Sequence, residues 1–174
     1  MILEANEKNT LLENFLSYIK IWTTSDPQKA DKGIQPSTAI QLDLANHIKN
    51  QLENLKIESH ITKNGYLCAR IPATKGYENC SSIGFLSHLD TASEVSGENV
   101  NPKIIENYDG KTIPLNDEVS IKIEENPELV KCQGQTIITT DGNTLLGADD
   151  KAGIAEIMTA LQILQNKNIA HGQI

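Results

Sequence analysis

The chain has 174 residues, of which 39% are hydrophobic, and this is enough to bury one sizeable core, so a single domain is expected. Fifteen Lys and Arg residues against 23 Asp and Glu residues give a formal net charge of -8. This acidic balance has the wrong sign for neutralising phosphates or binding an anionic lipid surface. We therefore expect no nucleic-acid partner and no membrane partner.

The cysteines and the amino terminus indicate the compartment. Cys68, Cys80 and Cys132 are odd in number and scattered, which favours neither a disulfide framework nor a thiolate zinc site. No stretch approaches the ~20 apolar residues needed to span a bilayer, and the amino terminus lacks the apolar run of a secretory signal. These features predict a cytoplasmic protein.

Two amphipathic helices are predicted in the amino-terminal part of the chain. Between residues 11 and 23, apolar residues recur at three- and four-residue spacing, and they are Leu12, Phe15, Leu16, Ile19 and Trp22. A second stripe of this kind consists of Ile40, Leu44, Ile48, Leu52 and Leu55. We expect Ser37 to cap this second helix and the polar stretch 25–36, which contains two prolines, to form a loop.

After Leu55 the hydrophobic pattern becomes that of strands. Residues 57–62 and 66–71 predict two strands joined at Asn64-Gly65, which is the strongest short hairpin signal. The run 82–87 is almost continuously apolar, which is typical of a strand covered on both faces. We therefore expect this run at the centre of the sheet.

The carboxyl-terminal part begins with an irregular stretch. Residues 93–133 are polar and broken by Asn, Gly and Pro, and they predict an excursion from the core with short strands of its own. The β-branched run 136–140 predicts a strand that meets an Asp141-Gly142 turn. Residues 169–174 are expected to form a loop entering a new strand. A final helix is predicted over about 151–164, with buried residues Ile154, Ile157, Met158, Leu161 and Leu164.

The first of two segments with metal-binding chemistry contains His88 and Asp90. These residues lie two positions apart at the end of the predicted central strand, so in an extended chain their side chains leave the same face. A metal-bound imidazole usually donates its other ring N–H to a carboxylate or a carbonyl, and Asp90 is placed to be that partner. A His-x-Asp pair by itself is more often a structural hydrogen bond.

The second segment contains Asp149 and Asp150, where a Gly-rich loop becomes the start of an apolar helix. Backbone N–H groups and the helix dipole favour carboxylates there by about 0.3–1 kcal/mol, and an isolated Asp-Asp at such a place is most simply a helix cap. A calcium loop fits poorly because Leu145 and Ala152 stand where oxygen ligands are needed. A phosphate loop is excluded because no Gly-Lys-Ser or Gly-Lys-Thr occurs.

Together the two segments carry a family resemblance. The order His88-x-Asp90, a long excursion, a Thr-Asp-Gly turn and then Gly-Ala-Asp-Asp-Lys-Ala-Gly resembles the M20 metallopeptidase family, and most closely its tripeptide aminopeptidases. Weaker similarity reaches back to the first helix, and the segments that match best are 84–91, 96–102, 104–108 and 134–174. The resemblance implies a zinc-dependent hydrolase that removes the amino-terminal residue of tripeptides.

The resemblance also implies roles for individual residues. His88 would bind one Zn²⁺ ion, Asp149 would bridge two, and Asp90 would be the catalytic residue that steadies the ring of His88. The peptide bond between Asp149 and Asp150 would be cis. Two such ions, roughly 3.5–4 Å apart, can share a hydroxide and polarise the scissile carbonyl.

Several functional residues of the family have no match in this chain: the glutamate base, the adjacent glutamate ligand, a later acidic ligand and a final histidine. Zinc takes about four ligands, so we expect the chain alone to hydrolyse peptides negligibly. His171 is a weak candidate for a substitute ligand, and His47 and His60 are expected to be solvent-facing or packed.

For the fold, the order of elements and the resemblance predict an α/β protein, a three-layer αβα arrangement with helices on both faces of a mixed central sheet. Residues 1–174 would form the amino-terminal part of the zinc-peptidase catalytic domain, with the dimerisation domain and the carboxyl-terminal part of the catalytic domain absent. The metal residues should lie at the carboxyl ends of central strands.

Two other functions stay open. One is a different M20 activity, such as that of a dipeptidase, carboxypeptidase or amidohydrolase. The other is a non-catalytic module whose open sheet edge pairs with a complementary chain. The expected partners are a tripeptide substrate and either a second copy of the chain or a complementary carboxyl-terminal fragment.

Overall fold

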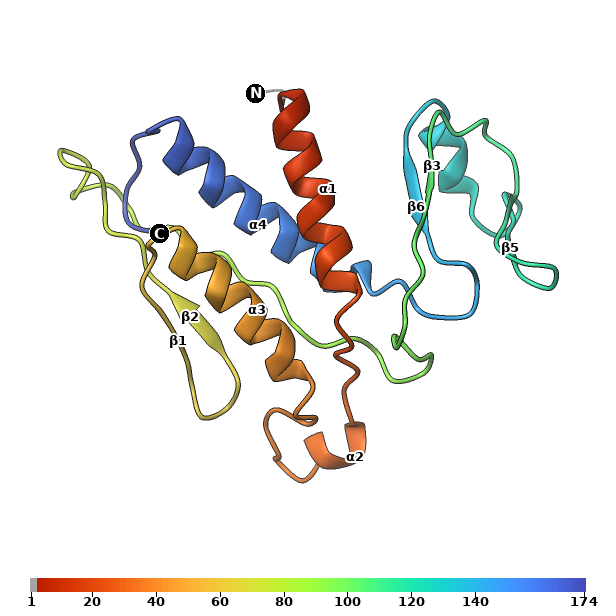
Figure 1. Ribbon diagram of the computed structural model, residues 1–174, viewed down its shortest axis with the longest axis horizontal. Helices are drawn as coiled ribbons and strands as arrows, with labels where there is room; N and C mark the ends of the chain where they lie inside the picture. Colours follow the sequence, from red (N-terminus) through yellow and green to blue (C-terminus); the bar gives the residue numbers. More distant parts are fainter. Residues whose placement is uncertain (1–2) are drawn as a thin grey trace.

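Three long helices form the main hydrophobic core of the computed structural model, which describes residues 3–174 (Figure 1). They are α1 (Ala5–Ile19), α3 (Gln41–Asn54) and α4 (Ala148–Asn166). Two short elements lie in the connections, the one-turn helix α2 (Pro27–Ala30) and the 3₁₀ helix η1 (Pro127–Cys132). Between residues 3 and 174, no helix is long and apolar enough to cross a lipid bilayer.

All three long helices were expected from apolar periodicity, but their ends differ from the prediction. Helix α1 begins earlier and ends before Trp22, which is exposed. Its start is stabilised by the side chain of Glu7, whose Oε2 accepts a 2.7 Å hydrogen bond from the backbone N–H of Glu4. Ser37 does not cap α3, because Ile40 occupies the cap position and the Ser37 hydroxyl instead accepts a hydrogen bond from the N–H of Asp26.

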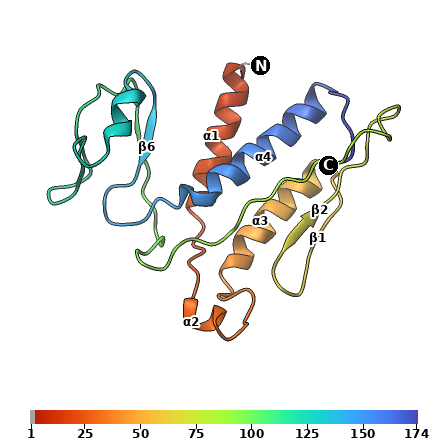
Figure 2. The same ribbon diagram turned by 180° about the vertical axis from the view of Figure 1, so that it is seen from behind.

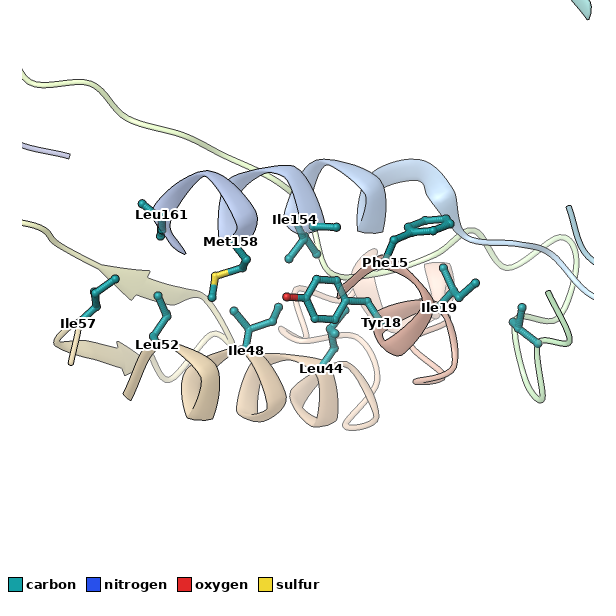
Figure 3. Close-up of a cluster of buried hydrophobic side chains, with 12 residues drawn as sticks. Phe15, Tyr18, Ile19, Leu44, Ile48, Leu52, Ile57, Ile154, Met158 and Leu161 are labelled. Carbon is teal, nitrogen blue, oxygen red and sulfur yellow. The ribbon is translucent and has the colours of Figure 1, made fainter. Parts of the chain in front are cut away.

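Tyr18 is the centre of the helical core (Figure 3). Its side chain is 0% exposed, and its ring lies between Leu44 of α3 and Ile154 of α4. Met158 of α4 points toward α3 and fills the space beside Ile48. Burial of each such side chain contributes roughly 1.5–3 kcal/mol. Ile157 and Leu164, which were expected inside, are only partly buried.

A buried polar network fixes how the three helices are rotated against one another. The hydroxyl of Tyr18 donates to Gln51 Oε1 at 2.6 Å, and the amide of Gln51 donates to Asn14 Oδ1 at 3.2 Å. The amide of Asn14 in turn donates to Thr159 Oγ1 at 3.0 Å. Because these bonds are directional, they favour one rotation of each helix where apolar contacts alone would tolerate several.

The strands within residues 3–174 form three separate antiparallel pairs. They are β1 (Ser59–Ile61) with β2 (Leu67–Ala69), β3 (Lys103–Ile105) with β6 (Ile137–Thr139), and β4 (Ile113–Pro114) with β5 (Ser120–Ile121). The β1–β2 hairpin confirms the Asn64-Gly65 signal, and Gly65 has the positive φ of 85° that such a turn requires.

The predicted excursion is also confirmed. Strands β3 to β6 and η1 form a lobe that lies apart from the helices, coloured green to cyan in Figure 1. The lobe has a small hydrophobic cluster of its own around Tyr108, Ile113 and Leu115.

The expectation of a central strand at 82–87 is wrong for this structure. The segment passes between α3 and α4 in both views (Figures 1 and 2), but it belongs to no strand. One backbone hydrogen bond, from Ile83 N–H to Gln173, joins residues 82–87 to the rest of the described chain. Leu86 is 97% exposed and Phe85 is 55% exposed. A central strand needs hydrogen-bonded neighbouring strands along both of its edges. Residues 3–174 do not provide them for 82–87.

The carboxyl-terminal tail pairs with the end of the hairpin. Ile174 and Ile71 exchange two backbone hydrogen bonds, of 2.7 and 3.0 Å, although neither residue is in an assigned strand. Residues 169–174 therefore run into strand-like pairing, in partial agreement with the expectation of a new strand.

We expect Met158→Ala to lower the free energy of unfolding by about 2–5 kcal/mol, because truncation leaves a cavity between α3 and α4. Urea unfolding followed by circular dichroism measures this loss. The control is Val130→Ala on the exposed side of η1, which should change stability by less than about 0.5 kcal/mol. Equal effects of the two substitutions would contradict the assignment of the core.

Candidate metal centre

The segment that carries His88 and Asp90 is anchored at Thr91. The N–H of Thr91 donates to the carbonyl of Thr23 at 3.1 Å, and the N–H of Ser25 donates to the carbonyl of Thr91 at 3.0 Å. These two bonds form an isolated parallel bridge between the chain after α1 and the end of the 82–91 segment. Since Thr91 is also buried, the backbone is fixed immediately after Asp90.

The start of α4 lies directly on this anchored segment, and two glycines make the approach possible. A Cβ on Gly147 would lie 3.0 Å from Thr91 Cγ2, and its φ of 73° also favours glycine. A Cβ on Gly153 would lie 2.6 Å from the hydroxyl of Ser87 and would collide with the Asp150 carboxylate. The two glycines of the Gly-Ala-Asp-Asp-Lys-Ala-Gly motif therefore allow the start of α4 to pack closely on the segment 87–91.

This packing brings together the three residues that the sequence singled out. His88 Nε2 lies 3.1 Å from Asp149 Oδ1. On the other side of the ring, His88 Nδ1 lies 2.9 Å from the carbonyl oxygen of Asp90 and 3.2 Å from its Oδ1. The peptide bond between Asp149 and Asp150 is cis, as the resemblance implied.

The charges around His88 favour its protonated form. Partial burial lowers the pKa of His88, but the hydrogen bond to Asp149 and the charge of Asp90 together outweigh it, so the pKa lies above its ordinary value. When the ring is protonated, His88 is the positive partner of both carboxylates.

Comparison with known proteins shows what the chain is related to. No protein-family model matches it. Peptidase T of Geobacillus thermodenitrificans is 48% identical over 171 residues, and peptidase T of Bacillus velezensis is 46% identical over 171 residues. Each alignment covers 96% of this chain and 41% of the relative. This chain is homologous to the amino-terminal portion of peptidase T. It spans about two fifths of the length of these relatives.

Solved structures confirm the fold class. The aminopeptidase PepT of Bacillus cereus superposes with a TM-score of 0.64 at 23% identity, over 96% of this chain and 35% of that one. A tripeptidase of Staphylococcus aureus gives 0.60 at 22% identity, with the same coverage of both chains. The chain therefore has the α/β fold seen in part of these two structures, although its strands between residues 3 and 174 do not form one continuous sheet.

The residues at the site fit half of the zinc centre that the M20 resemblance implied. An imidazole nitrogen and a carboxylate oxygen are both ordinary zinc ligands, and two ligands of one tetrahedral ion are about 3.3 Å apart. The 3.1 Å between His88 Nε2 and Asp149 Oδ1 agrees with that spacing. The Asp149 side chain is 97% exposed, which leaves the far side of the pair open. Among residues 3–174, no three His, Cys, Asp or Glu residues gather closely enough to hold an ion.

The other histidines do not take part in this centre. His47 packs edge-to-face on Tyr18 with 5.7 Å between the ring centroids, and His60 is exposed on β1. The Nδ1 of His171 contacts the carbonyl of its neighbour Gly172. The expectation that His47 and His60 are packed or solvent-facing agrees with the structure.

Sequence reasoning missed Lys151, which immediately follows the two aspartates. Its side chain is 1% exposed, and Nζ donates a 2.7 Å hydrogen bond to the carbonyl of Ile21. Burial lowers the pKa of Lys151 to about 8. A signal was present, because Lys151 precedes Ile154 and Met158 by three and seven positions and thus shares their buried helix face.

A cleft of about 1180 Å³ opens beside the site. His88, Asp90 and Asp150 line one part of it, and apolar side chains of α3 and α4, among them Ile48 and Met158, line another. Its volume exceeds the roughly 300–1,000 Å³ of most ligand sites.

We expect Asp149→Asn to lower the pKa of His88 in the metal-free protein, because the substitution removes a carboxylate that favours the imidazolium. An NMR titration of the His88 ring in the presence of a chelator measures this pKa. Asp150→Asn is the matched control, since Asp150 does not contribute to the shift of His88. An unchanged pKa in Asp149→Asn would show that the two side chains do not meet in solution.

Proposed function

We propose that this chain provides the first metal-binding half of a dizinc tripeptide aminopeptidase, which removes the amino-terminal residue of tripeptides. The observation that supports this most is the 3.1 Å approach of His88 Nε2 to Asp149 Oδ1 in a homologue of peptidase T. The two residues lie 61 positions apart, and the residues around both are specialised to bring them together. A zinc pair, a peptide substrate and a cytoplasmic setting belong to this proposal.

In this proposal each residue has a defined task. His88 would hold one Zn²⁺ through Nε2, and Asp149 would be the carboxylate shared between two ions. Asp90 would accept a hydrogen bond from the Nδ1–H of His88, which keeps the proton on Nδ1 and leaves the Nε2 lone pair free for the metal. When bound, the zinc pair supplies Lewis-acid activation of water and of the scissile carbonyl.

The chain by itself lacks the rest of such a centre among its described residues. His88 and Asp149 alone do not saturate one zinc ion, which takes about four ligands, and residues 3–174 gather no third ligand. We propose that residues 1–174 correspond to the amino-terminal part of the catalytic domain. The remaining ligands and the general base would come from polypeptide equivalent to the remainder of the peptidase T relatives.

We expect no release of amino acid from a tripeptide by the chain alone with Zn²⁺ or Co²⁺. Release should appear when the chain is co-produced with a polypeptide equivalent to the remaining part of Geobacillus thermodenitrificans peptidase T. In that complex, His88→Ala should reduce turnover to background, Asp90→Ala should reduce it about 10- to 100-fold, and a chelator should abolish it. Chromatography of the free amino acid measures each rate.

Robust, chelator-sensitive turnover by the isolated chain would contradict the incomplete-centre proposal. Dipeptides and acylated amino acids in the same assay test the alternative of another M20 activity. A preference for either over tripeptides would replace the proposed substrate while leaving the metal residues unchanged.

A specific observation also favours the second candidate, a module that pairs with a complementary chain. The apolar segment 82–87 has Leu86 and Phe85 exposed and a single backbone hydrogen bond to the rest of the described chain. It borders the 1180 Å³ cleft, whose far wall is formed by apolar residues of α3 and α4. Unpaired backbone beside an apolar surface suits the addition of a strand.

We expect Phe85→Asp to weaken co-elution of the chain with the complementary polypeptide in size-exclusion chromatography, because it places a charge on the apolar surface. Val130→Asp introduces the same charge at an exposed site on η1 and should leave co-elution unchanged. Dimers of the chain alone, detected by light scattering and abolished by Phe85→Asp, would instead identify a second copy as the partner.

A further inference from the structure

We propose that Lys151 is a positioning residue that holds Asp149 opposite His88, by tying the start of α4 to the chain segment that also anchors Thr91. The proposal rests on the function proposed above, since it assigns a task to a residue of the same site. Lys151 would contact neither metal nor substrate, and it would act through the backbone on which Asp149 is carried.

The geometry of the segment 21–25 carries the argument. At one end, the carbonyl of Ile21 accepts the 2.7 Å hydrogen bond from Lys151 Nζ. Two residues later, the carbonyl of Thr23 accepts the hydrogen bond from Thr91, and Ser25 returns one to Thr91. One short stretch of backbone therefore holds both halves of the site, the extended segment that carries His88 and the start of α4 that carries Asp149.

The same three segments also contact one another at Gly147. A Cβ at this position would lie 3.0 Å from Thr91 Cγ2, and 3.8 Å from both Cδ and Nζ of Lys151. The lysine side chain thus passes beside the loop that leads into Asp149. It extends from α4 to the backbone that follows α1. A displacement of the Lys151 side chain would move this loop relative to Thr91.

The choice of a charged side chain at this place supports a positioning task. Lys151 stands on the buried face of α4, in line with Ile154 and Met158, and one carbonyl is the acceptor found for its ammonium group. Burying an ammonium group with a single partner is unfavourable, and an apolar side chain of similar length would often give equal or greater stability. An apolar side chain cannot form a directional, charge-assisted hydrogen bond. Such a bond fixes the position of α4 relative to the backbone at Ile21.

Lys151→Met tests this directly, because methionine fills a similar volume without donating a hydrogen bond. The first readout is the set of nuclear Overhauser contacts between the His88 ring and the Asp149 β-protons in the metal-free chain. We expect these contacts to be lost while the melting temperature is unchanged or higher. In the complex of the chain with the polypeptide equivalent to the remaining part of peptidase T, Lys151→Met should lower the affinity for Co²⁺ about 10- to 100-fold.

Lys167→Met, at the carboxyl-terminal cap of α4, is the matched control. Lys167 pairs at 2.7 Å with both Glu4 and Glu7, so its loss should lower the melting temperature slightly and leave the His88–Asp149 contacts intact. If Lys151→Met does not fold, Lys151→Gln, which keeps a shorter donor, is examined by the same contacts. Persistence of the contacts in a folded Lys151 variant would overturn the proposal.

The failure of this proposal can be separated from the failure of the proposed function. Lost contacts in Lys151→Met, together with no hydrolysis by any complex, would support the positioning role and reject the peptidase assignment. Tripeptide hydrolysis by the complex, together with unchanged contacts and unchanged Co²⁺ affinity in Lys151→Met, would support the peptidase assignment and reject the positioning role.

Discussion

The site depends on one constraint, the hydrogen-bonded crossing of residues 23–25 and Thr91. The end of a strand-like segment normally has freedom to move, yet here both backbone groups of Thr91 are bonded to the chain that follows α1. The start of α4 then packs on the fixed residue through Gly147. Because Thr91 follows Asp90 directly, the position of the His88–Asp90 pair is set by contacts outside the pair itself.

The helical core transmits this constraint to α4. Tyr18 and Asn14 of α1 contact the other two long helices, and their polar atoms are bonded to Gln51 and Thr159. Rotation of α4 about its own axis would break the bond to Thr159 and would also displace Lys151, which follows the non-helical residues Asp149 and Asp150. Core packing and site geometry are therefore two consequences of one arrangement of helices, and a well-packed core favours an intact site.

Sequence reasoning succeeded where a local pattern determines the structure. Asn64-Gly65 indicated the hairpin because the turn needs a positive φ at Gly65, and the stripe on α3 specified its buried face. The proximity of His88 and Asp149 came from the family resemblance of both motifs, since no local pattern links residues so far apart. Their roles as metal ligands stay a proposal.

The errors have a common physical origin in non-local partners. The apolar run 82–87 has the composition of a buried strand, but burial depends on neighbours at its edges, which residues 3–174 do not supply. Tyr18 and Lys151 were overlooked because each carries a polar tip, although their helix positions are those of core residues. In both cases a polar partner on another segment permits burial, and helical periodicity does not reveal that partner.

The lobe between the two motifs has a consequence for how its length can vary. Strands β3 and β6 pair Lys103 with Thr139 and so bring the two ends of the lobe together before the chain enters α4. Chain inserted between these strands, for example near η1, would lengthen a loop that is already closed. Each doubling of such a loop adds only about 0.6 kcal/mol of closure entropy. The lobe can therefore tolerate large changes in size without altering the separation of the imidazole and carboxylate that flank it.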